Sequence, residues 1–296
     1  MRTRQLEYLV ALERERHFGR AASACHVTQP TLSAGLQALE AELGLELVRR
    51  GPRFEGLTAE GVALLPWAQR AIASERDLAA EAEALRSGEH GTLRVAAIPT
   101  ALPAVARLTA AFVAGRDDVR VEVRSSTSSD ALRGLEAFTC DVGVTYLDDA
   151  PDPGWRRVPL YDERYVLVGP EDGPFADRDE VRWDELGGVR VCLLTPDMRN
   201  RRLLDERFAA AGVRPDVVAT TDSPGVLLDH VRAGLHSVVA EAWTTGPGGL
   251  PGLTVRPLAG LETAASTVGL VLPEAGTPRP LVRAFVASAA GAGAPG

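Results

Sequence analysis

The sequence predicts a mixed α/β protein built from three consecutive parts. Residues 1–58 carry the pattern of short helices followed by a hairpin, residues 59–88 carry a single helical pattern, and residues 91–296 alternate strands with helices. Hydrophobic residues make up 45% of the 296 and charged residues 24%, which is typical of a globular protein in water. The length agrees with more than one compact part.

The negative charge of the chain is unevenly distributed. The formal net charge is −8, yet residues 1–60 hold eight arginines against eight acidic residues, so this part is neutral. All 32 basic residues are arginine, and two clusters, Arg2 with Arg4 and the arginines of 49–53, lie near the N-terminus. An acidic total argues against a nucleic-acid partner, but local clusters are what meet phosphates. The N-terminal part therefore stays a candidate for binding DNA.

Composition also predicts the compartment of the protein. No apolar run approaches the length of about 20 residues that spans a membrane. The N-terminus starts a charged amphipathic pattern and lacks the apolar core of a secretion signal, so we expect the chain to stay in the cytoplasm. Cys25, Cys140 and Cys192 lie far apart, and the five histidines show no metal-ligand spacing. We expect no metal and no cofactor.

Three helices are predicted at the N-terminus. Leucines at helical spacing indicate the first helix around residues 6–12, and an alanine-rich second helix follows at 20–26. Pro30 is well placed at the start of a third helix, since its missing N–H is not needed there. Leucines share one face of this helix, and Gly44 stands where a left-handed C-terminal cap is expected.

A short hairpin is predicted after the third helix. Residues 45–48 and 54–57 indicate its two strands, around a turn at 49–53, which completes a winged helix-turn-helix. Polar side chains on the third helix suit base edges and phosphates, and an arginine turn beside them suits phosphates. A solvated helix face is the alternative, which composition alone favours and the arginine turn disfavours. The residues expected to contact DNA are Thr28, Gln29, Thr31, Ser33, Gln37, Arg49, Arg50 and Arg53.

A dense set of short motifs occupies residues 4–61. They are Arg4-Gln5-Leu6, His17-Phe18, Ala21-Ala22, His26-Val27-Thr28-Gln29-Pro30-Thr31-Leu32-Ser33, Leu39-Glu40, Leu43-Gly44 and Leu57-Thr58 with Gly61. This combination closely resembles the LysR-type transcriptional regulators. The resemblance implies a regulator that binds a dyad promoter site in double-stranded DNA as a dimer or tetramer. The family often has arginine after the serine of the recognition helix, where this chain has Ala34, so target preference cannot be copied from relatives.

A long helix is predicted from the N-cap Thr58 to about Arg86. At about 1.5 Å per residue it measures roughly 40 Å, which exceeds one small domain. A narrow apolar seam on such a helix favours a partner helix, and packing on its own domain is the alternative. The family resemblance implies that residues 59–88 are a dimerisation linker. The seam residues are Leu65, Ala68, Ile72, Ala79 and Ala82, and Leu78 and Leu85 lie beside the seam.

The C-terminal part predicts an α/β fold with open sheets. The expected strands are Leu93–Ile98, Val119–Arg124, Asp141–Tyr146, Tyr165–Val168, Arg190–Leu194, Val217–Thr220, Ser237–Ala240 and Val268–Leu272. The expected helices are Leu102–Ala114, Ser129–Phe138, Arg199–Ala211 and Gly225–Ala233. This order resembles the effector-binding domain of the same family, which is similar to periplasmic binding proteins. The resemblance implies lobe one at 91–162 with 266–296, and lobe two at 163–265.

Two turns rich in small polar residues predict an effector site between the lobes. Residues 98–101 and 125–129 each lead from a strand into a helix, where free N–H groups and hydroxyls form an anion site. The matching family positions often hold a carboxylate or a small inorganic anion. Ordinary N-capping by serine and threonine is the alternative. The expected effector residues are Thr100, Ala101, Thr127, Ser128, Tyr146, Pro196 and Asp222.

The sequence thus predicts a transcriptional regulator that senses a small anionic effector. An architectural DNA-binding protein without an effector is one alternative, and it leaves a C-terminal domain of about two hundred residues unexplained. A solute-binding protein is another, which the arginine turn and the missing secretion signal disfavour. No Ser-His-Asp arrangement and no phosphate-binding loop supports an enzyme.

Overall fold

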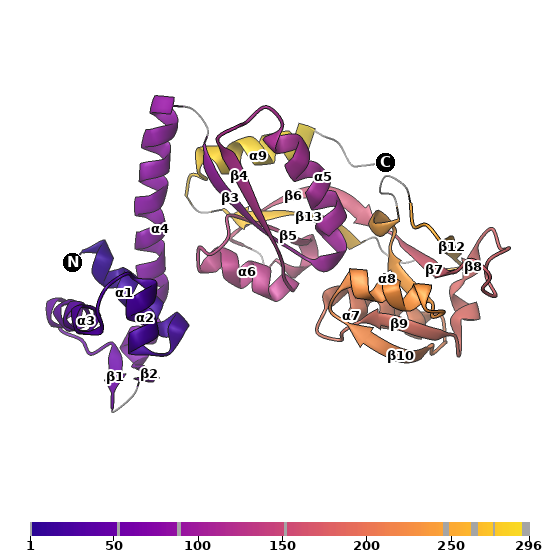
Figure 1. Cartoon of the computed structure of the whole chain (residues 1–296), viewed down its shortest axis with the longest axis horizontal. Helices are drawn as coiled ribbons and strands as arrows, with labels where there is room; N and C mark the ends of the chain where they lie inside the picture. Colours follow the sequence, from indigo (N-terminus) through magenta and orange to yellow (C-terminus); the bar gives the residue numbers. More distant parts are fainter. Residues whose placement is uncertain are drawn as a thin grey trace. The chain divides into compact units, whose positions relative to one another are not determined.

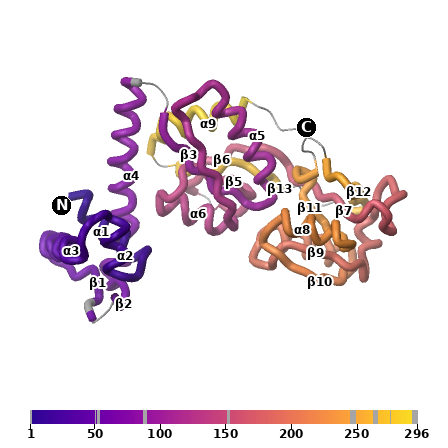
Figure 2. Tube along the Cα trace, in the orientation of Figure 1, coloured from indigo at the N-terminus to yellow at the C-terminus, as the bar shows by residue number. Residues whose placement is uncertain are grey.

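The computed structural model describes residues 2–51, 54–87, 90–150, 153–244, 249–261, 266–274 and 276–291. The chain divides into two compact units, residues 1–88 with 136–139, and residues 89–135 with 140–296 (Figure 1). Figure 2 traces the path of the chain through each unit. Among the described residues, no helix is both long enough and apolar enough to cross a membrane.

The first unit contains the predicted three helices, hairpin and long helix. The elements are α1 (Thr3–Glu15), α2 (Phe18–Ala24), α3 (Gln29–Leu43), β1 (Val48–Arg50), β2 (Phe54–Leu57) and α4 (Ala59–Ser87). Leu9 and Leu12 of α1 pack with Leu32, Leu36 and Leu39 of α3 in one apolar core. The leucine face expected on the third helix is confirmed for these three leucines, whereas Leu43, at the end of the helix, is 38% exposed. The opposite face of the helix is exposed to solvent.

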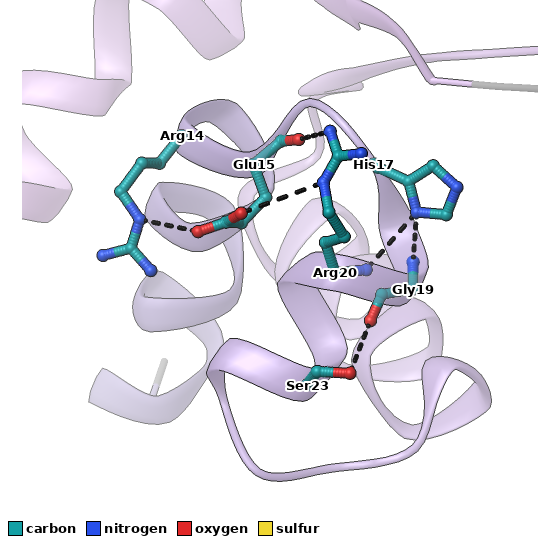
Figure 3. A network of polar contacts seen from close by, with 6 residues as sticks. All are labelled: Arg14, Glu15, His17, Gly19, Arg20 and Ser23. Carbon is teal, nitrogen blue, oxygen red and sulfur yellow. Dashed lines mark hydrogen bonds and ion pairs between the residues drawn. The ribbon is translucent and has the colours of Figure 1, made fainter.

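Side-chain caps fix where the helices begin. His17 Nδ1 accepts hydrogen bonds from the N–H groups of Gly19 and Arg20, at 3.0 and 3.3 Å, and so caps α2 (Figure 3). Thr28 Oγ1 accepts from the Thr31 N–H at the start of α3. Thr58 Oγ1 accepts from the Gly61 N–H at 2.9 Å, which confirms the predicted cap of the long helix.

The first strand of the hairpin is shorter than the expected 45–48 and begins later, at Val48. The carboxylate of Glu40, on α3, accepts hydrogen bonds from the N–H groups of Leu47 and Val48 at 2.9 and 3.1 Å. Residues 45–47 are therefore held against the helix instead of extending the ladder. As a result Arg49 and Arg50 lie on the strand, and not in the turn as predicted.

Helix α4 contains Pro66 in its interior, a residue that argues against the unbroken helix predicted from the spacing of its apolar residues. A proline there cannot donate the usual backbone hydrogen bond one turn back. The helix nonetheless extends over 29 residues. Its N-terminal half packs against α1, and this contact gives it support beyond its own hydrogen bonds.

The second unit begins with a five-stranded sheet in the order β4-β3-β5-β13-β6 (Figure 1). The strands are β3 (Gly91–Ala97), β4 (Val119–Ser125), β5 (Val142–Tyr146), β6 (Trp155–Glu163) and β13 (Ser266–Pro273). The helices are α5 (Leu102–Val113), α6 (Ser128–Glu136) and α9 (Pro280–Gly291), with η1 (Pro99–Ala101) and η2 (Leu147–Asp149) as short turns. Residues of α5 and α9 pack on one face, including Phe112 against Phe285, and α6 packs on the other.

The rest of the unit builds lobe two around mixed sheets. Its strands are β7 (Tyr165–Pro170), β8 (Val181–Arg182), β9 (Arg190–Leu194), β10 (Asp216–Thr221), β11 (Ser237–Ala240) and β12 (Leu253–Ala259). Its helices are α7 (Arg199–Ala210) and α8 (Pro224–Arg232), with η3 (Trp183–Leu186) and η4 (Glu241–Trp243). Successive residues of β7 point to opposite faces of its sheet. Leu167 packs in the core that contains α7, and Val168 packs in the core that contains α8, so the two helices cover opposite faces of the sheet.

All eight strands and four helices expected in this part are present, with ends that shift by a few residues. Three strands and one helix were missed: β6, β8, β12 and α9. Two of these strands contain an internal proline, Pro159 in β6 and Pro257 in β12, which argues against a strand when the sequence is taken alone. Both are extensively paired through their neighbours in the sheet.

Candidate DNA interface and effector pocket

The predicted DNA-contacting residues of α3 lie on its solvent side. Gln29, Thr31 and Gln37 are exposed, and Ser33 is half-buried. The Thr28 hydroxyl is used locally, because it caps the helix and lies 2.8 Å from the Thr31 hydroxyl. The exposed amides and hydroxyls are hydrogen-bonding groups of the kind that contact base edges.

The arginines of the wing differ in what they contact. Arg49 is exposed, and its Nε donates to the Leu57 carbonyl at 2.9 Å across the hairpin. Arg50 belongs to β1, but its side chain and the whole of Arg53 lie outside the described residues. From the other cluster, Arg4 donates to Glu7 at 2.7 Å and to the Cys25 carbonyl, so it serves the fold.

The predicted dimer seam of α4 is divided between two environments. Ala68 is buried, and Leu65 and Ile72 are partly buried, all in the core of the N-terminal unit. For these three residues the alternative of packing on the helix's own domain is correct, because α1 covers them. Ala79 and Ala82 are exposed.

A second apolar row on the same helix is exposed, and it includes the two leucines that were expected beside the seam. Trp67, Leu78 and Leu85 are 64%, 72% and 81% exposed. At about 100° per residue, these three positions fall within about 20° of one line along the helix. This row lacks a cover within the described part of the chain.

The two interpretations of the polar turns in lobe one, effector binding and helix capping, apply to different residues. Thr127 is the cap of α6, since its Oγ1 accepts from the Asp130 N–H at 3.1 Å. Thr100 and Ser128 are both buried, and their hydroxyls have no hydrogen-bond partner of normal geometry. Capping therefore explains Thr127 and leaves Thr100 and Ser128 as groups that can receive a ligand.

A buried polar cluster lies beside Thr100. The hydroxyls of Tyr146 and Tyr165 donate to Glu163 Oε2 at 2.5 and 2.7 Å, and Asn200 Nδ2 donates to the same oxygen at 3.3 Å. Glu163 ends β6, and Asn200 comes from α7 of lobe two, so the cluster joins both lobes. Of its members, only Tyr146 was predicted as a site residue.

Burial raises the pKa of Glu163, and the hydrogen bonds from Tyr146 and Tyr165 oppose that rise. Burial and the neighbouring Glu163 raise the pKa of both tyrosines well above the ordinary value, so they remain protonated donors. Sequence reasoning missed Glu163 because the strand that carries it was not expected. A lone glutamate in a strand gives no sequence signal of its own.

A pocket lies between lobe two and the start of α5. It is small, with room of about 10 Å³ for the centre of a water-sized molecule, and it is partly open to solvent. Its lining residues are Thr100, Leu194, Asn200, Pro224, Leu227, Leu228, Val238, Val239, Ala240 and Trp243. Pro196 and Asp222 are exposed and do not line it, and Ala101 is buried next to Thr100. Most of the lining is therefore apolar and comes from residues that sequence reasoning did not select.

All three cysteines are buried and reduced. Burial raises the pKa of the Cys25 and Cys192 thiols, and it raises the pKa of Cys140 to about 12. Each thiol therefore stays protonated at neutral pH, whereas the thiolate is the reactive form. Within the described residues, no group of three His, Cys, Asp or Glu side chains is placed to hold a metal ion.

The C-terminal domain matches the LysR substrate binding domain over residues 86–294, and residues 3–62 match the bacterial regulatory helix-turn-helix protein, lysR family. The DNA-binding transcriptional dual regulator OxyR of Escherichia coli is 32% identical over 199 residues, 66% of this chain and 64% of that protein. The chain thus aligns with less than two thirds of that relative's length. A probable hydrogen peroxide-inducible genes activator of Mycobacterium avium is 31% identical over 93% of this chain and 84% of that protein.

Solved structures show the same fold over nearly the whole chain. A full-length OxyR variant from Pseudomonas aeruginosa has a TM-score of 0.74 at 24% identity, and covers 98% of this chain and 94% of its own. Full-length CbnR complexed with its target DNA has a TM-score of 0.68 at 24% identity, and covers 98% and 99%. With its helix-turn-helix and substrate-binding domain, the chain belongs to the LysR family of DNA-binding transcriptional regulators.

Proposed function

We propose that this regulator binds a dyad promoter site through two copies of α3 and responds to a small molecule held between the lobes. The observation that carries the effector proposal is the pair of buried, unpartnered hydroxyls of Thr100 and Ser128. Buried hydroxyls that do not cap a helix and have no partner are costly unless a ligand or water satisfies them. Thr100 also lines the pocket, which supports a ligand at that place.

Contacts between the lobes supply a means of response. Leu203 of α7 packs into the core of lobe one, and Arg199 of the same helix lies 3.3 Å from Asp149 of η2. A ligand that binds one arrangement of the lobes more tightly than another shifts the balance between them. We propose that this shift changes how the protein engages DNA.

The relatives named as hydrogen peroxide-inducible activators suggest a second candidate, the sensing of peroxide. Peroxide oxidises a thiolate, and the reactive cysteines of redox sensors are accessible and have a low pKa. Here all three cysteines are buried with a raised pKa. We therefore favour reversible ligand binding over cysteine oxidation as the signal.

Self-association is proposed to use the exposed face of α4. The row of Trp67, Leu78 and Leu85 is apolar, and a partner helix would cover it. Ala79 and Ala82, from the predicted seam, lie on the exposed half of the helix and remain candidates at the edge of this contact. A dimer of this kind carries two DNA-binding domains. Their combined avidity compensates for the weak non-specific affinity expected from residues 1–60, which have no net positive charge.

Replacing Thr100 tests the effector site. Thr100→Val keeps the side-chain shape and removes the unpartnered hydroxyl, so we expect it to abolish stabilisation by the effector while leaving promoter binding unchanged. A thermal-shift screen of carboxylates, inorganic anions, amines and alcohols identifies the stabilising compound, because a ligand that binds only the folded state raises the unfolding temperature. Thr127→Val is the matched control, since that hydroxyl is a cap. An unchanged response in Thr100→Val would contradict the site.

Replacing Gln37 tests the reading face of α3. Gln37→Ala is expected to weaken binding at the specific promoter site by about tenfold, because an amide contact to a base is worth about 1–3 kcal/mol. Footprinting on the DNA upstream of the chain's own gene measures the affinity for the specific site, and titration on unrelated DNA measures the non-specific affinity. Binding to unrelated DNA serves as the internal control and should not change. Equal loss on both DNAs would mean that Gln37 does not read bases.

A further inference from the structure

Helix α7 of lobe two is fastened to lobe one by three residues in its N-terminal half. Arg199 lies 3.3 Å from Asp149 of η2. Asn200 donates a hydrogen bond of 3.3 Å to Glu163, at the end of β6. Leu203 packs into the core of lobe one. These three contacts, called the α7 clasp, hold the two lobes together through the chain's own side chains.

The hydrogen bond from Asn200 is the polar contact of the clasp that water reaches least. Asn200 and Glu163 are only 5% and 4% exposed. The side chains of Arg199 and Asp149 are 27% and 19% exposed. Water competes with the partly exposed ion pair, whereas a buried acceptor that loses its donor cannot turn to water instead. We therefore expect Asn200 to contribute most of the polar strength of the clasp.

The pocket beside the clasp is closed around a very small space. Its room of about 10 Å³ for the centre of a water-sized molecule is about what one buried water needs. Of the residues that line it, Thr100 comes from lobe one, and the others, including Asn200, come from lobe two. A molecule of several heavy atoms can therefore fill the pocket only if Thr100 and the wall from lobe two move apart.

Two hydrogen-bonding groups of this lining are buried and unused. They are the Thr100 hydroxyl and the Trp243 indole N–H, which have no partner of normal geometry within the described part of the chain. The indole N–H can only donate, so it favours a ligand with an acceptor atom. A ligand that accepts from it gains a hydrogen bond that the closed arrangement lacks, and this gain offsets the loss of the clasp.

We propose that the α7 clasp by itself holds the lobes closed, and that the effector, a small molecule with a hydrogen-bond acceptor, acts by opening them. This proposal rests on the proposed function and gives its conformational change a direction. A ligand shifts an equilibrium toward the arrangement that it binds more tightly. Because the closed pocket admits only a water-sized molecule, that arrangement is the open one. The effector therefore competes with the clasp instead of drawing the lobes together.

The distance between one spin label on each lobe tests the proposal on the full chain, by double electron–electron resonance. Ala287→Cys on α9 and Asp229→Cys on α8 supply exposed label sites, whereas the three native cysteines are buried. Labelled chain is diluted with unlabelled chain, so that the distance recorded lies within one copy. An intact clasp is expected to give a single narrow distribution at the distance of the closed arrangement.

Two substitutions are expected to lengthen this distance by more than about 2 Å, the scale of a domain rearrangement. Asn200→Leu nearly keeps the size of the side chain but removes the buried donor of the clasp. Thr100→Phe places a ring in the pocket that exceeds its room, and so acts as a ligand attached to lobe one. Asp205→Asn is the matched control on α7, because the pair of Asp205 with Arg201 lies within lobe two. The control should leave the distance unchanged.

Three results would overturn the proposal: a long or broad distribution with the clasp intact, or an unchanged distance in either Asn200→Leu or Thr100→Phe. Each lobe keeps an apolar core of its own, so both variants are expected to fold, and circular dichroism checks this. Loss of the folded state also counts against the proposal, because opening of the lobes should relieve the strain. The proposed function fails separately, if the chain protects no promoter DNA in the footprint.

Discussion

Arg279→Met is expected to lower the free energy of unfolding of the second unit by about 3–5 kcal/mol, because it strands a buried charge. The guanidinium of Arg279 contacts Asp141 Oδ2, and these side chains are only 11% and 3% exposed. The same carboxylate oxygen accepts the Arg94 N–H at 2.8 Å. Asp141 precedes β5 and Arg279 precedes α9, so the pair ties the returning end of the chain to the middle of the sheet.

Urea unfolding of the full chain, followed by circular dichroism and the fluorescence of its tryptophans, measures this loss. Arg133→Met is the matched control, since Arg133 pairs with Asp130 on the surface with side chains 68% and 49% exposed. An exposed pair is worth less than about 1 kcal/mol. Equal losses for the two variants would show that the Asp141 carboxylate does not depend on Arg279.

Gly61→Val is expected to unfold the helix-turn-helix part and to abolish binding to DNA. A Cβ atom at Gly61 would lie 2.2 Å from the Leu47 carbonyl oxygen and 3.1 Å from Leu57 Cβ. That carbonyl cannot move freely, because it accepts the Thr58 N–H at 3.0 Å. Overpacking against fixed backbone costs about 3 kcal/mol, enough to disrupt the junction of hairpin and helix.

Gly44→Ala separates the effect of the clash from that of losing a glycine. Gly44 has φ +68° at the end of α3, but nothing lies within 4 Å of the added Cβ. Its expected cost is about 1 kcal/mol, from the left-handed backbone alone. Hydrogen exchange of the hairpin amides and promoter affinity report both variants. If Gly61→Val behaves like Gly44→Ala, the close approach to Leu47 does not constrain the domain.

Local signals in the sequence predicted most of the first unit. Thr28, Thr58 and Gly44 specify helix ends through contacts within a few residues, so the sequence contains all the information needed. The start of β1 was wrong because Glu40, seven residues before Leu47, captures the backbone of the intended strand. A side chain that binds backbone at that separation leaves no periodic pattern.

Periodicity gave the apolar face of α4 but not what covers it. Leu65, Ala68 and Ile72 recur at helical spacing whether a partner helix or α1 lies against them. The sequence likewise identifies the hydroxyl-bearing residues in the turns of lobe one. It does not show that Thr127 caps a helix whereas the Thr100 hydroxyl has no partner, because that difference depends on the surroundings of each side chain in the fold. The carboxyl of Glu163 meets Asn200, 37 residues away, through contacts that no spacing rule describes.

The strand order of the five-stranded sheet constrains how the protein matures during synthesis. Strand β13 lies between β5 and β6, so β6 has no neighbour in that sheet until the ribosome has released residues beyond 273. The intervening hundred or so residues can begin to fold while the sheet of lobe one is still incomplete. Until β13 is added, the edge of β5 that it will pair with stays uncovered. A nascent chain stalled or cut in this interval is thus the form of the protein most in need of a chaperone.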